Sequence, residues 1–254
     1  MSPDIIPARS EAEWPSSPEG GMSGGHEIMM TEWEWKLEPQ LNTESLTAAA
    51  GRYHYHDADL GLLYEVYRKV KERLQVTAWC ALEQNSEERA GREWTVRRDL
   101  EEDAAQHSLE GTLAWAAVTL GEWPDELQEY YVRKERYTES YMAECLCWEL
   151  LREAYAQLNE RLYAHTRLYA SSLFFPGQEL PLAWMERILD RLGRKRLEEG
   201  GLFWLPEGMM RPRQSVAYLI RLQEEEAACA SVCAGCERKD CAARRKNEGV
   251  WQEE

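Results

Sequence analysis

The sequence has few basic residues for its acidity, and it lacks any long apolar run. Its 254 residues include 30 Lys and Arg against 46 Asp and Glu, which gives a formal net charge of −16. A protein that binds nucleic acid needs a basic face to meet the phosphates, so we expect no nucleic-acid partner. The longest apolar run, residues 113–118, is much shorter than the roughly 18–20 residues of a membrane span. We therefore expect no membrane partner either.

Several familiar signatures are also missing. The N-terminus has no basic region followed by an apolar core, so no signal peptide is predicted and we expect a cytoplasmic protein. In a reducing cytosol, the seven Cys are better suited to be metal ligands, reactive thiols or core residues than a disulfide framework. The chain shows no Ser-His-Asp arrangement, no P-loop and no G-x-G-x-x-G motif, so we predict none of those sites.

What is present is enough apolar material for a folded core. Hydrophobic residues make up 44% of the chain, with 11 Trp and 12 Tyr, and disordered chains are poor in aromatics. Residues 1–38 differ, because Pro, Ser, Gly and Glu dominate there and eight acidic residues face two basic ones. We interpret residues 1–38 as a flexible acidic leader. Within it, residues 33–37 alternate like a short strand.

Residues 39–223 form the predicted folded domain. The most regular pattern covers residues 137–163, where apolar side chains recur every three or four positions and predict a mostly buried helix. Helices and strands mix without a regular βαβ alternation, which favours an α+β fold. A short helix is predicted from a cap at Asn42 or Thr43 to Gly51, and further helices are predicted at residues 57–74, 100–109 and 182–193. Strands are predicted at residues 76–82, 93–97, 112–120, 168–175, 201–205 and 215–222.

The most specific chemistry lies in residues 224–254, a predicted Cys-rich metal-binding tail. Cys229, Cys233, Cys236 and Cys241 form a C-x3-C-x2-C-x4-C pattern. Thiolates this close together can converge on one soft metal centre. A structural zinc site usually has two Cys pairs that are separated by a dozen or more residues. The compact spacing therefore favours a [4Fe–4S] cluster, with zinc or unliganded thiols as the alternatives.

Basic residues surround these thiols: Arg238, Lys239, Arg244, Arg245 and Lys246. A cluster at this position can pass electrons in or out, and a basic patch on an acidic protein can dock an acidic electron donor. The alternative is that these residues only solvate the tail. The other three thiols, Cys80, Cys145 and Cys147, fall in strand or buried-helix patterns and are predicted to be core residues.

Three short segments carry a family resemblance when they are taken in order. They are Val-Thr-Leu-Gly at 118–121, Phe-Pro-Gly at 175–177 followed by Leu-Pro-Leu at 180–182, and Met-Arg-Pro-Arg-Gln-Ser-Val at 210–216. Over residues 41–222 the chain resembles the reactivation domain of cobalamin-dependent methionine synthase, and especially the free-standing form of that domain. The resemblance implies an α+β fold with a central, mostly antiparallel sheet and flanking helices.

The resemblance also implies a function. The family reactivates a corrinoid (vitamin B12)-dependent methyltransferase, because one electron and a methyl group from S-adenosylmethionine restore methyl-cobalt(III) from an oxidised cobalt(II) cofactor. The partner is then a corrinoid protein that carries cobalamin. By the same resemblance, Pro176, Gly177, Gln178 and Ser215 are the predicted S-adenosylmethionine-binding residues.

The chain departs from the family loop R-x-x-P-G-Y at two positions. Leu173 stands where the family has Arg, and Gln178 stands where it has Tyr. An Arg there would offer a charged fork to the cofactor. We therefore hypothesise that the protein keeps corrinoid docking and reduction and relies less on S-adenosylmethionine. The alternative is a non-enzymatic, zinc-stapled docking module for a corrinoid protein, so the sequence leaves open whether catalysis occurs on this chain.

Overall fold

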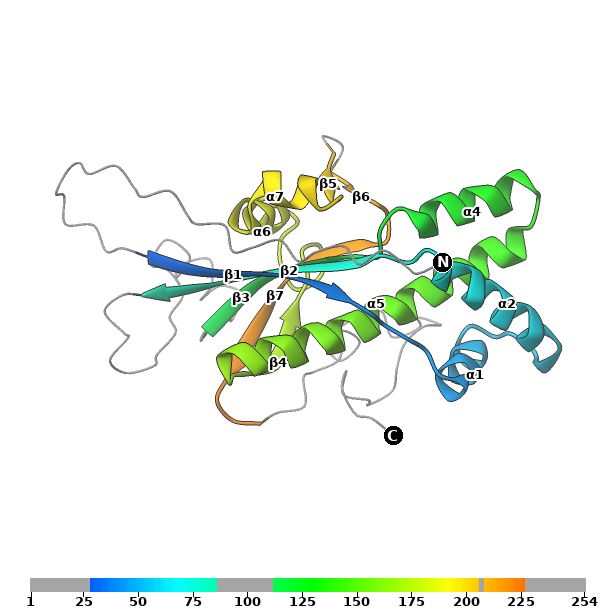
Figure 1. Ribbon diagram of the computed structural model, residues 1–254, viewed down its shortest axis with the longest axis horizontal. Helices are drawn as coiled ribbons and strands as arrows, with labels where there is room; N and C mark the ends of the chain where they lie inside the picture. Colours follow the sequence, from blue (N-terminus) through cyan, green and yellow to red (C-terminus); the bar gives the residue numbers. More distant parts are fainter. Residues whose placement is uncertain (1–27, 86–111, 206–207, 227–254) are drawn as a thin grey trace, which may run out of the picture.

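One five-stranded antiparallel sheet forms the centre of the protein, in a computed structural model that describes residues 28–85, 112–205 and 208–226 (Figure 1). The strand order is β1-β2-β3-β7-β4, which confirms the predicted α+β class and its antiparallel sheet. The sheet strands are β1 (Ile28–Leu37), β2 (Val76–Asn85), β3 (Thr112–Thr119), β4 (Tyr169–Phe174) and β7 (Ser215–Gln223).

Helices cover both faces of this sheet. The long helix α5 (Tyr137–Thr166) crosses one face, and the shorter helices on that side pack against its N-terminal half (Figure 1). These are α1 (Thr43–Arg52), the 3-10 turn η1 (Asp57–Asp59), α2 (Leu60–Lys71) and α4 (Trp123–Arg133). The other face carries α6 (Trp184–Leu192), α7 (Arg194–Glu199) and the small hairpin β5 (Phe203–Trp204) and β6 (Met210–Arg211). In the described segments, no helix is both long enough and apolar enough to cross a membrane.

Strand β3 shows how the sequence builds two cores from one sheet. Successive side chains of a strand point to opposite faces, so Ala114 and Ala116 face the α5 side while Trp115 faces α6. Both faces are covered, and for that reason the strand reads as a continuous apolar run. The alanines leave room for the broad, buried face of α5, while the indole of Trp115 stacks on Trp184 of α6 at a centroid distance of 6.4 Å.

The N-terminal boundary differs from the predicted leader of residues 1–38. Strand β1 begins at Ile28 and pairs with β2 along its whole length, from Ile28 opposite Asn85 to Leu37 opposite Val76. Trp33 and Trp35 pack against the core on the α5 side. This burial and the ten-residue ladder place residues 28–37 in the sheet, so the folded part starts well before residue 39.

Four predicted features lie outside the described residues. They are the rest of the leader at 1–27, the strand at 93–97, the helix at 100–109 and the Cys-rich tail from residue 227 onward. The other predicted elements have counterparts. The helix predicted at 137–163 is α5, and the strand predicted at 112–120 is β3.

Gly121 makes the turn between β3 and α4, and its substitution gives a first testable prediction. Its φ of +78° is unfavourable for other residues, and an added Cβ would lie 2.8 Å from the Gln75 carbonyl oxygen. We expect Gly121→Ala to lower the free energy of unfolding by about 2 kcal/mol, from left-handed strain and crowding together. Urea unfolding followed by circular dichroism measures this change.

Gly61 in α2 is the matched control, because an added Cβ there meets no atom within 4 Å. Gly61→Ala is expected to leave stability unchanged or to raise it by about 0.5–1 kcal/mol through better helix propensity. Equal effects of the two substitutions would contradict the conformational role of Gly121.

Candidate functional site

The predicted cofactor loop follows β4 and closes on itself. The Gly177 amide donates to the Leu180 carbonyl at 2.7 Å, and the Gln178 amide donates to the Phe175 carbonyl at 3.0 Å. The Phe175 amide donates to the Glu179 carboxylate at 3.0 Å. The backbone donors of the loop are therefore used inside the turn.

The surface of this loop is uncharged at its tip. Pro176 is half-buried, whereas Gly177 and Gln178 are exposed. Gly177 has a φ of +86°, and an added Cβ would meet only Leu182 Cδ1, at 3.8 Å. The loop can be approached closely from solvent, and it presents an amide side chain and the exposed Leu182 rather than a cation.

Leu173, at the position of the family Arg, lies inside the core. It is 6% exposed, pairs with Ile220 of β7 and packs on the α5 side of the sheet. The Leu173 side chain is therefore uncharged and is shielded from solvent. The residues present thus do not fit the charged contact that the family makes to S-adenosylmethionine.

Ser215 starts β7 and is tied into the end of the sheet. Its hydroxyl donates to Thr119 Oγ1 at 2.7 Å, and the Gly121 amide donates to the same oxygen at 3.2 Å. The Leu120 amide donates to the Gln214 carbonyl at 2.9 Å. These bonds join the end of β3 to the start of β7.

Arg213, in the same 210–216 motif, fixes helix α4 to the sheet. Its backbone amide donates to Asp125 Oδ2 at 2.9 Å, and its guanidinium donates to Asp125 Oδ1 at 3.3 Å and to Gln128 at 3.4 Å. The 210–216 motif therefore has a structural role in the described residues, because it positions α4 and the strand ends.

The predicted residues share one end of the sheet without forming one cluster. Phe174 of β4 lies opposite Leu219 of β7, so the 176–178 loop and Ser215 extend toward the same end. Across the described residues, no hydrogen bond joins this loop to Ser215. Their role in ligand binding stays a prediction.

The predicted metal ligands Cys229, Cys233, Cys236 and Cys241 lie outside the described residues. Within residues 28–85, 112–205 and 208–226, no group of three or more His, Cys, Asp or Glu side chains is placed to hold a metal ion. Cys80, Cys145 and Cys147 are buried thiols without disulfides, as predicted.

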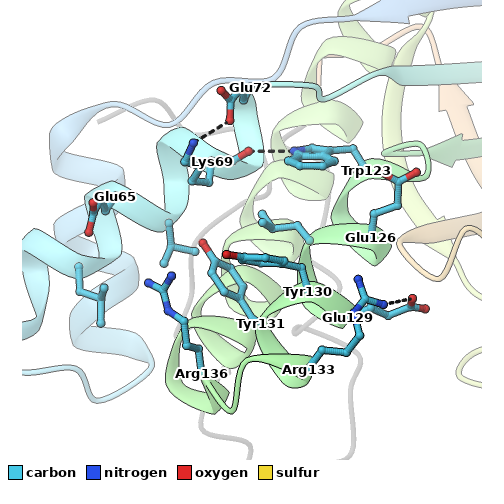
Figure 2. Close-up of a pocket in the computed structure, with 13 residues that line it drawn as sticks. Glu65, Lys69, Glu72, Trp123, Glu126, Glu129, Tyr130, Tyr131, Arg133 and Arg136 are labelled. Atoms are coloured by element: carbon cyan, nitrogen blue, oxygen red, sulfur yellow. Dashed lines mark hydrogen bonds and ion pairs between the residues drawn. The ribbon is translucent and has the colours of Figure 1, made fainter.

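A groove between α2 and α4 was not predicted from the sequence. Its volume is about 580 Å³, and its walls combine aromatic rings with charged side chains (Figure 2). The periodicity of each helix is visible in the sequence. The groove, however, depends on how close α2 and α4 lie in space, and these helices are far apart in the chain. No short sequence motif encodes that spacing.

Comparisons with known proteins give a structural likeness only. Neither a protein-family model nor a curated protein matches the chain. Among solved structures, the chain is similar to a protein described as the crystal structure of the MetH reactivation domain bound to AdoHcy. The TM-score is 0.50 at 13% sequence identity, covering 78% of this chain and 80% of that chain. At this identity the likeness shows a shared fold.

Proposed function

We propose that the protein assists the reactivation of a corrinoid-dependent methyltransferase such as methionine synthase. The observation that carries the proposal is the fold likeness to the MetH reactivation domain, which extends over 78% of the chain. The 210–216 motif adds support, since it resembles the signature of that family and organises one end of the sheet. The expected partner is a protein that carries cobalamin.

The Cys-rich tail is the proposed route for electrons. Cys229, Cys233, Cys236 and Cys241 supply four soft donors within a short stretch, and such donor sets suit an iron–sulfur cluster. A bound cluster would supply one electron at a time, and cobalt(II) needs one electron to become cobalt(I). The basic residues around the tail would meet an acidic electron donor.

We expect S-adenosylmethionine to contribute less to this function than electron transfer does. The structural neighbour was crystallised with AdoHcy, so the ligand is a reasonable probe for this chain. Leu173 is buried and the loop amides of Gly177 and Gln178 bond within the turn, so we expect weak binding there. Reduction and docking are then the activities that this chain retains.

The test is an anaerobic reconstitution. We expect the purified chain to contain iron and acid-labile sulfide and to be brown. With an added low-potential chemical reductant as the electron source, we expect it to speed the reduction of cob(II)alamin bound to the corrinoid domain of methionine synthase. Cys233→Ala should lose iron and this acceleration, because a cluster with one missing thiolate is unstable. Ser231→Ala, in the same segment, is the control and should keep both.

Two outcomes would contradict the proposal in different ways. A colourless protein with one zinc per chain that binds the corrinoid domain would support the docking module instead. An iron–sulfur protein that neither binds nor reduces any corrinoid carrier would be an electron carrier for another partner.

A further inference from the structure

The groove between α2 and α4 has the dimensions of a small-molecule site. Its volume of about 580 Å³ lies within the roughly 300–1,000 Å³ typical of ligand pockets. Val66 of α2 and Leu127 of α4 line its apolar part, and Figure 2 shows the aromatic and charged side chains of the two helices around it. The groove is thus concave, partly apolar and rimmed by polar groups.

Three aromatic rings line the groove. Tyr131 is 3% exposed and belongs to the core, while its neighbour Tyr130 is 44% exposed, with ring centroids 5.8 Å apart. The indole of Trp123 is held in place because its Nε1 donates to the Lys69 carbonyl at 2.8 Å. The face of an aromatic ring carries negative charge and attracts cations.

The protein already places its own organic cations on two of these rings. The Arg136 guanidinium lies over Tyr131, 5.0 Å from the ring centroid, and the Arg73 guanidinium lies over Trp123 at 4.5 Å. Among the described residues, no Lys or Arg lies over the ring of Tyr130. Tyr130 is therefore the aromatic surface of the groove that an external cation can reach.

Among the charged side chains that line the groove, one carboxylate has no ion-pair partner in the described residues. The basic side chains that line it are each paired with a glutamate: Lys69 with Glu72 at 3.1 Å, Arg133 with Glu129 at 3.6 Å, and Arg136 with Glu139 at 2.7 Å. Glu126 pairs with Arg73 at 3.4 Å. Glu65 has no ion-pair or hydrogen-bond partner within the part of the chain that the structure describes.

Glu65 faces the same groove as the aromatic residues. It lines the groove from α2, and Tyr130 lines it from α4 (Figure 2). An unpaired carboxylate, an accessible ring and an apolar floor are the features that recognise an organic cation.

We propose that this groove binds a small methylated ammonium compound, with the cation over Tyr130 and within reach of Glu65. A simple metal cation would gain little from the apolar floor, and an anion would meet the unpaired carboxylate. The inference goes beyond the proposed function, because it needs neither the Cys-rich tail nor a corrinoid partner.

Choline and its neutral isostere 3,3-dimethylbutan-1-ol test the proposal on the full chain. They share shape and differ in charge, so their binding is compared by calorimetry or ligand-observed NMR at constant ionic strength. We expect choline to bind more tightly, and Tyr130→Ala to weaken choline binding about two- to five-fold, the worth of an exposed cation–π contact. Glu65→Gln should weaken choline binding while leaving the alcohol unchanged.

Tyr137→Ala is the matched control, because Tyr137 is a 64% exposed tyrosine that does not line the groove. It should bind choline like the unmodified chain. Tyr130 and Glu65 are exposed, so thermal unfolding should show that all three variants fold. Equal binding of choline and the alcohol, or full choline binding by both groove variants, would overturn the proposal. Either result would leave the corrinoid assay unaffected.

Discussion

Replacing Glu149 with alanine is expected to lower the free energy of unfolding by about 3–5 kcal/mol, the usual cost of leaving a buried charge without its partner. Glu149 lies in α5 and is 6% exposed. It accepts a hydrogen bond from the Tyr53 hydroxyl at 2.9 Å and another from Arg52 at 3.2 Å, and it pairs with Arg152 at 3.8 Å. Alanine would remove the carboxylate that bonds to Tyr53 and Arg52 and pairs with Arg152.

Comparing two substitutions of Glu149 separates the effect of losing the charge from the effect of losing the side-chain packing. Glu149→Gln keeps an acceptor but removes the charge, so it should cost less than Glu149→Ala. A double-mutant cycle with Arg52→Ala measures the coupling between the two side chains, which should be more than about 1 kcal/mol for residues in direct contact. Urea unfolding of the four proteins gives the values.

Glu160→Ala is the control on the same helix, because Glu160 is exposed and surface changes usually stay within about 0.5 kcal/mol. A loss below about 1 kcal/mol in Glu149→Ala would show that solvent reaches the cluster and screens it. The measurement matters for function as well, because α5 is the helix on which α1, α2 and α4 pack. Helices α2 and α4, which form the walls of the groove, are therefore held in place by α5.

The elements that were correctly predicted from sequence are those whose pattern is local and long. Helix α5 covers 30 residues, so the three- and four-residue spacing of its apolar side chains recurs many times and can be recognised in the sequence. Strand β3 is buried on both faces, and its apolar run can be read without knowing its neighbours. The α+β class followed because these patterns alternate irregularly along the chain.

The features that were missed depend on contacts between distant segments. Residues 28–32 carry no clear alternation, and they join the sheet because β2 offers a full ladder of partners. The 176–178 loop resembles a ligand loop in sequence, but only the structure reveals that its amides bond within the turn. In the same way, the packing of Leu173 in the core depends on the pairing of β4 with β7.

Raising the pH from 8 to 10 is expected to destabilise the fold by several kcal/mol through three buried thiols. Cys80, Cys145 and Cys147 are at most 1% exposed. Burial raises the pKa of the Cys145 thiol to about 11 and lifts the pKa of the other two well above the usual range. In the unfolded chain, a thiol has a pKa of about 8.5.

The direction of the effect follows from which state loses protons. Between about pH 8.5 and the native pKa, the unfolded chain releases thiol protons while the native protein keeps them. Alkali therefore favours unfolding, and the stabilisation is fully present only below about pH 8.5. One pKa unit corresponds to about 1.4 kcal/mol, so each thiol contributes about 2 kcal/mol at pH 10. Three thiols amount to about 6 kcal/mol, comparable to the whole stability of many domains.

Urea unfolding midpoints at pH 8, 9 and 10, with a reducing agent and a chelator present, measure this loss. Staying at or below pH 10 limits the contribution of buried tyrosines such as Tyr155, whose pKa burial also raises. Cys147→Ala should lower stability at pH 8, because it leaves a small cavity, and should reduce the pH dependence by about one third of the total, since one of three thiols is gone. A midpoint that is constant from pH 8 to 10 would show that these sulfurs ionise as readily in the folded protein as in the unfolded chain, and hence that water reaches the core beneath α5.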